Sequence, residues 1–257
     1  MIEYDPGPPL EIADILAAVP DCAPHRDYFW YDWGPVFYRG RLDGSSRLLC
    51  VASDPGPTER IALRTLVGDA GQRVQGFLAK LGLSHSYLCL NAFAYGLIPS
   101  QADRAGAVLR DPRQVEWRNA LFTGATGPSL QAIVAFGVHA RDAVRGWDPR
   151  PDVPVFDVPH PSSRDQAVLL ARWRDAIDEL RSIVTPDPDA SPPEANYGAA
   201  FTEADYARIP SRDLPFGLPG WVGDDAWGRR ATPPHRNSVW RPQPDDRHTL
   251  ICVAPRG

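Results

Sequence analysis

The sequence has 257 residues, of which 43% are hydrophobic and 23% charged, so it is long enough to bury a sizeable core as an ordinary soluble protein. Its formal net charge of −5 argues against a protein that binds nucleic acid through bulk positive charge, but it permits a local basic rim. Apolar runs in the sequence stay well short of the roughly 20 residues that a membrane span needs. The acidic, proline-rich start does not fit a secretory signal, and we expect a cytoplasmic protein.

The first third of the chain predicts a helix, an aromatic-rich segment and two strands. Apolar residues at helical spacing predict a helix near 10–19. Residues 27–38 are dense in aromatic side chains, which favours core packing or a lid over a base-stacking platform. Strands are predicted at 35–42 and 47–52, and the second is continuously apolar, as in a parallel sheet that is covered on both faces.

Helices and strands then alternate as far as residue 184. Proline and glycine in SDPGPTE, residues 53–59, indicate a turn rather than a helix or strand. The spacing of apolar residues predicts helices near 70–82, 113–122, 128–132, 138–144 and 166–184, and strands at 86–91, 132–136 and 154–158. This alternation predicts an α/β fold, a three-layer α/β/α sandwich with a central, mostly parallel four-stranded sheet.

The composition changes at residue 185. Twelve of the 28 prolines lie in residues 186–257, and this part also contains Trp221, Trp227 and Trp240 and ends in the apolar, strand-like sequence HTLICVA. We therefore expect an α/β domain at 1–184, then a proline-rich linker and a Pro/Trp-rich C-terminal extension at 185–257 that packs on the core. The cysteines, Cys22, Cys50, Cys89 and Cys252, form no CxxC pair, so we expect buried thiols and no metal or other cofactor.

Three polar residues follow predicted strands: Asp54, Asn91 and His160. In open α/β sheets, ligands bind beyond the carboxyl ends of the strands. The sequence therefore predicts a site at this edge of the sheet.

Five short motifs surround these residues: VASDPGPTE at 51–59, LVGDAG at 66–71, LN at 90–91, FG at 136–137 and HPS at 160–162. Each is common alone, but in this order and spacing they resemble the uracil-DNA glycosylase superfamily over residues 46–184. The resemblance implies a monomeric, cofactor-free enzyme. Such an enzyme flips a base out of DNA that contains uracil or another deaminated base, cleaves its bond to the sugar, and leaves an abasic site and free uracil.

The resemblance also implies roles for individual residues. Asp54 would orient the attacking water and stabilise the cationic sugar, and a neutral His160 would donate to O2 of the leaving base. Asn91 would read the base edge, because one amide can pair with both N3–H and O4 of uracil. The remaining implied site residues are Ser53, Gly56 and Leu66 in the base pocket, and Ser162, Ser163 and Arg164 on the DNA. The alternatives are that Asp54 caps a turn, that His160 is a loop residue without a role, that Asn91 caps a turn at the strand end, and that the serines cap the following helix.

Two departures from the family pattern concern the base pocket. Gly56 stands where the best-known branch has a tyrosine that blocks 5-methyl bases, so we expect relaxed specificity. Leu66 stands where iron–sulfur-bearing relatives place a stacking phenylalanine, which Phe93, Tyr95 or an N-terminal aromatic residue would have to replace. The cysteine spacing of those relatives is absent, so we expect no cluster.

Two other functions remain open at this point. A protein of the same fold could hold DNA lesions without turnover or trap them covalently, although binding alone would need neither Asp54 nor His160. A hydrolase with Ser162 or a cysteine as nucleophile is a third class, but the sequence contains no GxSxG motif to support it.

Overall fold

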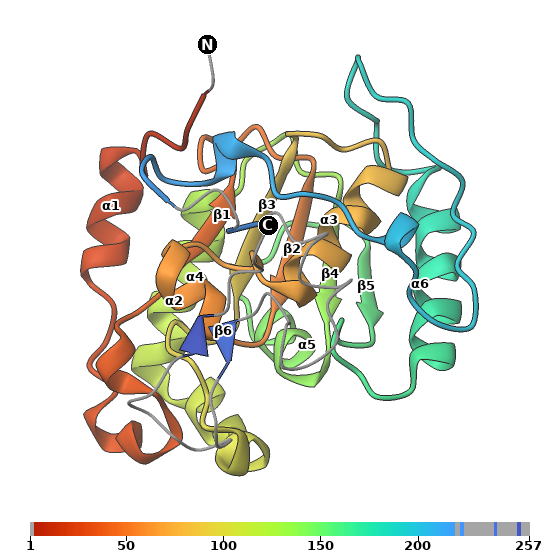
Figure 1. The fold of residues 1–257 in the computed structure, drawn as a ribbon. Helices are drawn as coiled ribbons and strands as arrows, with labels where there is room; N and C mark the ends of the chain where they lie inside the picture. The colour runs from red at the N-terminus through yellow and green to blue at the C-terminus, as the bar shows by residue number, and fades with distance from the viewer. Residues whose placement is uncertain (1–2, 219–221, 224–238, 241–250, 253–257) are drawn as a thin grey trace.

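The computed structural model describes residues 3–218, 222–223, 239–240 and 251–252, and a five-stranded sheet lies at its centre (Figure 1). The strand order is β1-β3-β2-β4-β5. The strands are β1 (Tyr38–Gly40), β2 (Leu48–Ala52), β3 (Tyr87–Asn91), β4 (Ala132–Phe136) and β5 (Val155–Val158). All neighbouring pairs are parallel except β1 and β3. The predicted mostly parallel sheet is confirmed, but it has a fifth strand, because part of the segment predicted at 35–42 joins the sheet as β1.

Helices cover both faces of the sheet. They are α1 (Leu10–Ala17), α2 (Pro57–Ala62), α3 (Asp69–Lys80), α4 (Pro112–Ala125), α5 (Val138–Arg145) and α6 (Gln166–Leu180). Apolar side chains of α1, α4 and α5 form one core with Leu49 and Val51 of β2, while those of α3 and α6 form a second core with Leu48 and Cys50. Alternate residues of a strand point to opposite faces, so this division confirms the predicted three-layer sandwich.

Two local predictions are wrong. The helix predicted near 128–132 is absent: the backbone turns after residue 127, and Leu130 packs in the core as the chain enters β4. The stretch read only as a turn, residues 53–59, contains the start of α2 at Pro57. Proline suits the first turn of a helix, where its missing N–H would have no intrahelical partner.

The described part of residues 185–218 lies along the α/β domain. Ala195 and Tyr197 are buried in the core that α3 and α6 form. Asp205 pairs with Lys80 at 3.3 Å, and Asp213 pairs with the buried Arg39 at 2.9 Å. Farther along, β6 (Val239–Trp240) pairs with β7 (Ile251–Cys252), which lies within the strand-like sequence near the end of the chain.

Trp221 and Trp227 lie outside the described residues, as do the side chains of Trp240 and Cys252. The other three cysteines are buried free thiols, as predicted. In the part of the chain that the structure describes, no helix has both the length and the apolar character that crossing a membrane requires.

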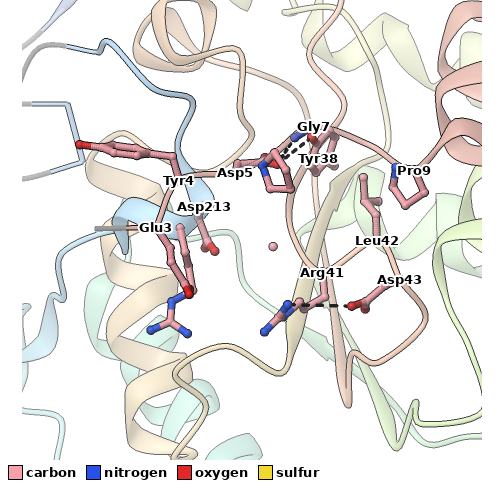
Figure 2. A pocket seen from close by; sticks show the side chains of 13 residues that line it. Glu3, Tyr4, Asp5, Gly7, Pro9, Tyr38, Arg41, Leu42, Asp43 and Asp213 are labelled. Atoms are coloured by element: carbon pink, nitrogen blue, oxygen red, sulfur yellow. Dashed lines mark hydrogen bonds and ion pairs between the residues drawn. The ribbon is translucent and has the colours of Figure 1, made fainter. Parts of the chain in front are cut away.

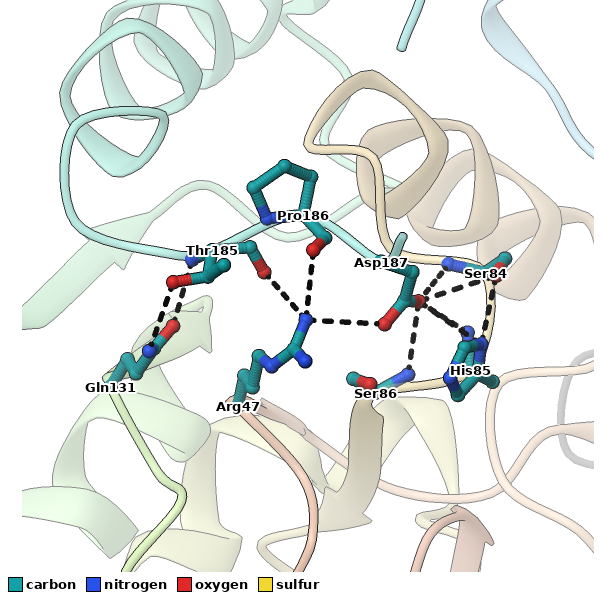
Figure 3. Close-up of polar contacts among 8 residues, drawn as sticks. All are labelled: Arg47, Ser84, His85, Ser86, Gln131, Thr185, Pro186 and Asp187. Atoms are coloured by element: carbon teal, nitrogen blue, oxygen red, sulfur yellow. Dashed lines mark hydrogen bonds and ion pairs between the residues drawn. The ribbon is translucent and has the colours of Figure 1, made fainter. Parts of the chain in front are cut away.

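A buried carboxylate fastens the start of the C-terminal segment (Figure 3). Asp187 Oδ2 accepts hydrogen bonds from the backbone N–H groups of Ser84, His85 and Ser86 at 2.7, 2.9 and 3.3 Å. Its other oxygen lies 3.3 Å from Nη1 of Arg47. Burial alone would raise the pKa of Asp187, but these hydrogen bonds outweigh it and lower the pKa to about 2. The ionised carboxylate is therefore the form that holds the segment.

Asp187→Ala is expected to lower the free energy of unfolding by roughly 2–3 kcal/mol, because it removes the shared acceptor of the three backbone N–H groups of residues 84–86. Because folding depresses the pKa, the wild-type contribution is present above the ordinary carboxyl value of 3.8 and is lost as pH falls towards about 2. Urea unfolding at pH 7 and at stepped acid pH measures both effects. The exposed Asp189→Ala is the matched control, and equal stability of the two variants would contradict the role of Asp187.

Candidate active site

The ends of the parallel strands bring the predicted residues to one edge of the sheet. Asn91 ends β3 and pairs in register with Ala52, the last residue of β2, so Asn91 and Asp54 follow adjacent strands. Backbone hydrogen bonds extend this pairing beyond the strands, since the N–H of Phe93 donates to the carbonyl of Ser53 at 2.9 Å. His160 follows β5, two strands away from β2, which corresponds to about 10 Å between strand axes.

The Asp54 carboxylate is half-buried and fixed by a distant loop. Its Oδ2 accepts the backbone N–H of Leu97 at 2.8 Å, from a residue 43 positions further along the chain. This tertiary contact holds the carboxylate in one orientation at the sheet edge.

Asn91 is a buried amide with no hydrogen-bond partner in the part of the chain that the structure describes. The residue is 6% exposed, and among the described residues neither Oδ1 nor Nδ2 has a hydrogen-bond partner. Leaving a buried polar group unpaired costs on the order of 1–3 kcal/mol, so such groups are rare and call for an explanation. A ligand with a neighbouring donor and acceptor would satisfy both atoms at once.

His160 is held as a neutral ring with a defined tautomer. The backbone N–H of Ser162 donates to Nδ1 at 3.1 Å, so Nδ1 is the acceptor and Nε2 carries the proton. Burial lowers the pKa of His160 to about 4, with smaller contributions from His139 and Arg73. The ring is therefore an uncharged N–H donor at neutral pH.

Gly137 makes room for this histidine at the end of β4. Its φ of 90° is one that glycine adopts without strain. A Cβ at this position would lie 3.0 Å from Cβ of His160, so glycine also permits the close approach of the two loops.

His139, on the first turn of α5, is a site residue that the sequence interpretation missed. Its Nδ1 lies 2.9 Å from Oγ of Ser53, and its ring meets the ring of Phe93 edge-on at 5.1 Å. Burial lowers its pKa, while a hydrogen bond to the backbone of Ala102 raises it, as donation to a carbonyl would. The signal was present in the FG motif, because a histidine two residues beyond Gly137 lies near the carboxyl end of β4.

Glu59 is the second residue that was missed, and it joins two loops of the site. The residue is 8% exposed, and its carboxylate accepts the backbone N–H groups of Gly56, Val67 and Gly68 at 3.0, 2.8 and 2.9 Å. A Cβ on Gly56 would lie 2.8 Å from Oε2 of Glu59. Glycine at this position therefore leaves room for the Glu59 carboxylate to accept the Gly56 N–H at the start of α2. It also places no side chain in the predicted base pocket.

Leu66 lies in the same pair of loops in an unusual conformation. It is 6% exposed, has a φ of 54°, and belongs to the apolar cluster that contains Ala52 and Phe136. A left-handed leucine costs about 1 kcal/mol, which the surrounding contacts must offset. Glycine at Gly71 permits it, because a Cβ there would overlap the Leu66 carbonyl.

The predicted DNA-contacting residues lie on the surface beyond His160. Ser162 and Arg164 are exposed, and Ser163 is half-buried and donates its N–H to the carbonyl of His160 at 2.8 Å. The helix-capping alternative for the serines is wrong, because Asp165 caps α6 by accepting the N–H of Val168.

A cavity of about 350 Å³ lies beside β1 (Figure 2). Its described lining comes from the N-terminal segment, from residues around Tyr38 and Arg41, and from Asp213, and it contains none of the predicted site residues. Among the described residues, no three His, Cys, Asp or Glu side chains form a group that could hold a metal ion.

Comparisons with known proteins give distant likenesses to solved structures. No protein-family model matches the chain, and no curated protein matches it. Among solved structures it is similar to the WT UNG crystal structure from Nitratifractor salsuginis, with 15% sequence identity over 70% of this chain and 94% of that chain and a TM-score of 0.35. A likeness at this level carries no argument about activity, so the chemistry has to be inferred from the side chains at the strand ends.

Proposed function

We propose that this protein is a DNA glycosylase that hydrolyses the N-glycosidic bond of uracil in DNA and leaves an abasic site. The observation that carries the proposal is the Asn91 amide, buried and without a described partner beside the strand end that bears Asp54. Uracil presents N3–H next to O4, which matches the free acceptor and donor of this amide. An asparagine with only a structural role would have its hydrogen bonds satisfied within the protein.

Of the strand-end residues, Asp54 and His160 have separate roles in bond cleavage. As the bond breaks, positive charge develops on the sugar and negative charge on the departing base. The Asp54 carboxylate orients the water and stabilises the sugar cation. The Nε2–H of His160 donates to O2 of the base, and a neutral donor suffices in a site with little water.

The pocket loops suggest a range of substrates wider than uracil. Gly56 contributes no side chain where a blocking ring would stand, and Leu66 presents an aliphatic surface. We infer that other deaminated bases and 5-substituted uracils are also excised. Ser162, Ser163 and Arg164 contact the DNA, through phosphate and, for Arg164, the gap that the flipped base leaves.

The experiment that tests the proposal uses oligonucleotides with one uracil, in single and double strands. Incubation with the protein and EDTA, followed by hot alkali, should cut the strand at uracil, and thymine at the same position is the control. A shifted band without scission would instead indicate a lesion-binding protein, and a complex that survives denaturation would indicate covalent trapping. If the protein neither cleaves nor binds these oligonucleotides, the glycosylase and the lesion-binding protein are both excluded.

The breadth of specificity needs a second panel. Matched oligonucleotides that carry hypoxanthine, xanthine or 5-hydroxymethyluracil are compared with uracil under single-turnover conditions. Release of uracil alone would contradict the wide pocket inferred from Gly56, without affecting the proposed chemistry.

A further inference from the structure

One arginine of α3 lies between the C-terminal segment and the loop of His160. The side chain of Arg73 is 14% exposed, and its Nη1 donates to the carbonyl of Pro161 at 2.6 Å. Its Nε donates to Oη of Tyr206 at 3.0 Å, and its Nη2 pairs with Asp69 at 2.8 Å. The guanidinium therefore connects α3, the C-terminal segment and the residue next to His160.

The C-terminal segment holds this arginine with two aromatic rings. The guanidinium carbon lies 4.5 Å from the ring centroid of Phe201 and 5.4 Å from that of Tyr206. The two rings are themselves in contact, with centroids 5.8 Å apart. Rings at these distances attract the cation and restrict it to one position.

The same segment is fitted closely along α3. Gly76 allows the approach, since a Cβ there would lie 2.0 Å from the carbonyl oxygen of Asp205. The N–H of Ala207 donates to the carbonyl of Gln72 at 3.1 Å, and Asp205 pairs with Lys80 at 3.3 Å. Residues 201–207 are thus a fixed support for Arg73.

On the other side, Arg73 faces the His160 loop. The charged and titratable groups that act on His160 are Arg73 from α3 and His139 from α5, and Asp69 partly offsets the arginine. A fixed cation near the ring disfavours a second positive charge on the imidazole. The contact with Pro161 also restricts the backbone that carries the ring.

We propose that Arg73, clamped by Phe201 and Tyr206, is a positioning residue for His160, which makes residues 201–207 a working part of the active site. Arg73 holds the loop through the Pro161 carbonyl and places a permanent positive charge beside the imidazole. The consequence for catalysis rests on the proposed glycosylase function, while the effect on the ring itself does not.

The first test follows the His160 ring by NMR in protein with labelled histidine, assigned with His160→Gln. Arg73→Gln removes the charge, and Arg73→Lys keeps it. In Arg73→Gln the protonated fraction of His160 at pH 5 should rise about threefold, the effect of losing one partly screened charge. It should stay unchanged in Arg73→Lys and in Arg26→Gln, a surface control with the same loss of charge. Identical titrations of wild type and folded Arg73→Gln would overturn the electrostatic part.

The second test examines the hold on the loop and remains available if Arg73→Gln does not fold. Tyr206→Phe keeps the ring but removes its hydrogen bond to Arg73, so the amides of Ser162 and Ser163, both bonded to His160, should exchange several-fold faster. Unchanged exchange in both Tyr206→Phe and Arg73→Lys would overturn the positioning role. If the protein releases uracil, the acid limb of its single-turnover rate should move to higher pH in Arg73→Gln. If it releases none, the NMR results still decide the inference.

Discussion

Asp54→Asn is expected to lower the single-turnover rate of uracil release by about 10²–10³-fold, with almost no loss of affinity for uracil-containing DNA. The amide oxygen of asparagine can still accept the N–H of Leu97, which the carboxylate accepts at 2.8 Å, so the loop keeps its place. The variant loses the negative charge below the sugar and the ability to orient water as a carboxylate does. Only the transition state, which carries the positive charge, is affected.

Alkali scission measures the rate, and fluorescence anisotropy with a labelled oligonucleotide measures the affinity. Asp175→Asn, an exposed residue of α6, makes the same change of charge away from the strand ends and should behave as wild type. A rate within threefold of wild type for Asp54→Asn would remove Asp54 from the chemistry. Loss of affinity in parallel with rate would instead indicate a structural role in the DNA-binding surface.

The buried strands were predictable because each carries its own signal. The segments 47–52, 86–91 and 132–136 are short apolar runs bounded by turn residues, and they form β2, β3 and β4 within one residue of the predicted limits. Strands that are covered on both faces need no alternation with polar residues, so an apolar run identifies them. The fifth strand was not counted, because the antiparallel pairing of β1 with β3 joins residues about 50 apart, and a local pattern does not encode it.

The residues of the candidate site likewise include some that a local sequence pattern indicates and some that it does not. Asp54, Asn91 and His160 could be proposed from the sequence because each follows a recognisable strand, and parallel strands bring their carboxyl ends together. His139 and Arg73 were missed because their roles depend on partners far away in the sequence. Ser53 is 86 residues from His139, and Tyr206 is 133 residues from Arg73. Glu59 is near its partners in sequence, but it lies in a stretch that was predicted to be a turn. Its role as the cap of α2, which begins at Pro57, was therefore not predicted.

His160→Gln is expected to reduce uracil release by about 10²–10³-fold and to flatten the acid dependence of stability. Glutamine retains an N–H donor but not the rigid ring that Ser162 and Gly137 place. Burial lowers the pKa of His160 from 6.5 to about 4, so the unfolded chain takes up a proton in this range that the folded protein does not. The contribution of the neutral ring is full above pH 6.5 and is lost as pH falls to about 4.

Across this window His160 alone should lower the free energy of unfolding by at most about 3 kcal/mol, so the fall should be clearly smaller in His160→Gln than in wild type. His139, whose pKa burial also lowers, adds to the fall, so His139→Gln in the same chain should reduce it further. Urea unfolding between pH 7 and pH 4 measures the slopes, and equal slopes in wild type and His160→Gln would contradict a neutral His160 ring in the folded protein.

The pH dependence of the rate separates the two forms in which His160 could act. A neutral donor gives a single-turnover rate that is level from pH 8 to about pH 5 and falls as the ring is protonated near pH 4. A cationic donor would give a rate that rises as pH falls towards the same value. A rising acid limb in wild type that disappears in His160→Gln would therefore leave the histidine in the reaction but reverse its charge.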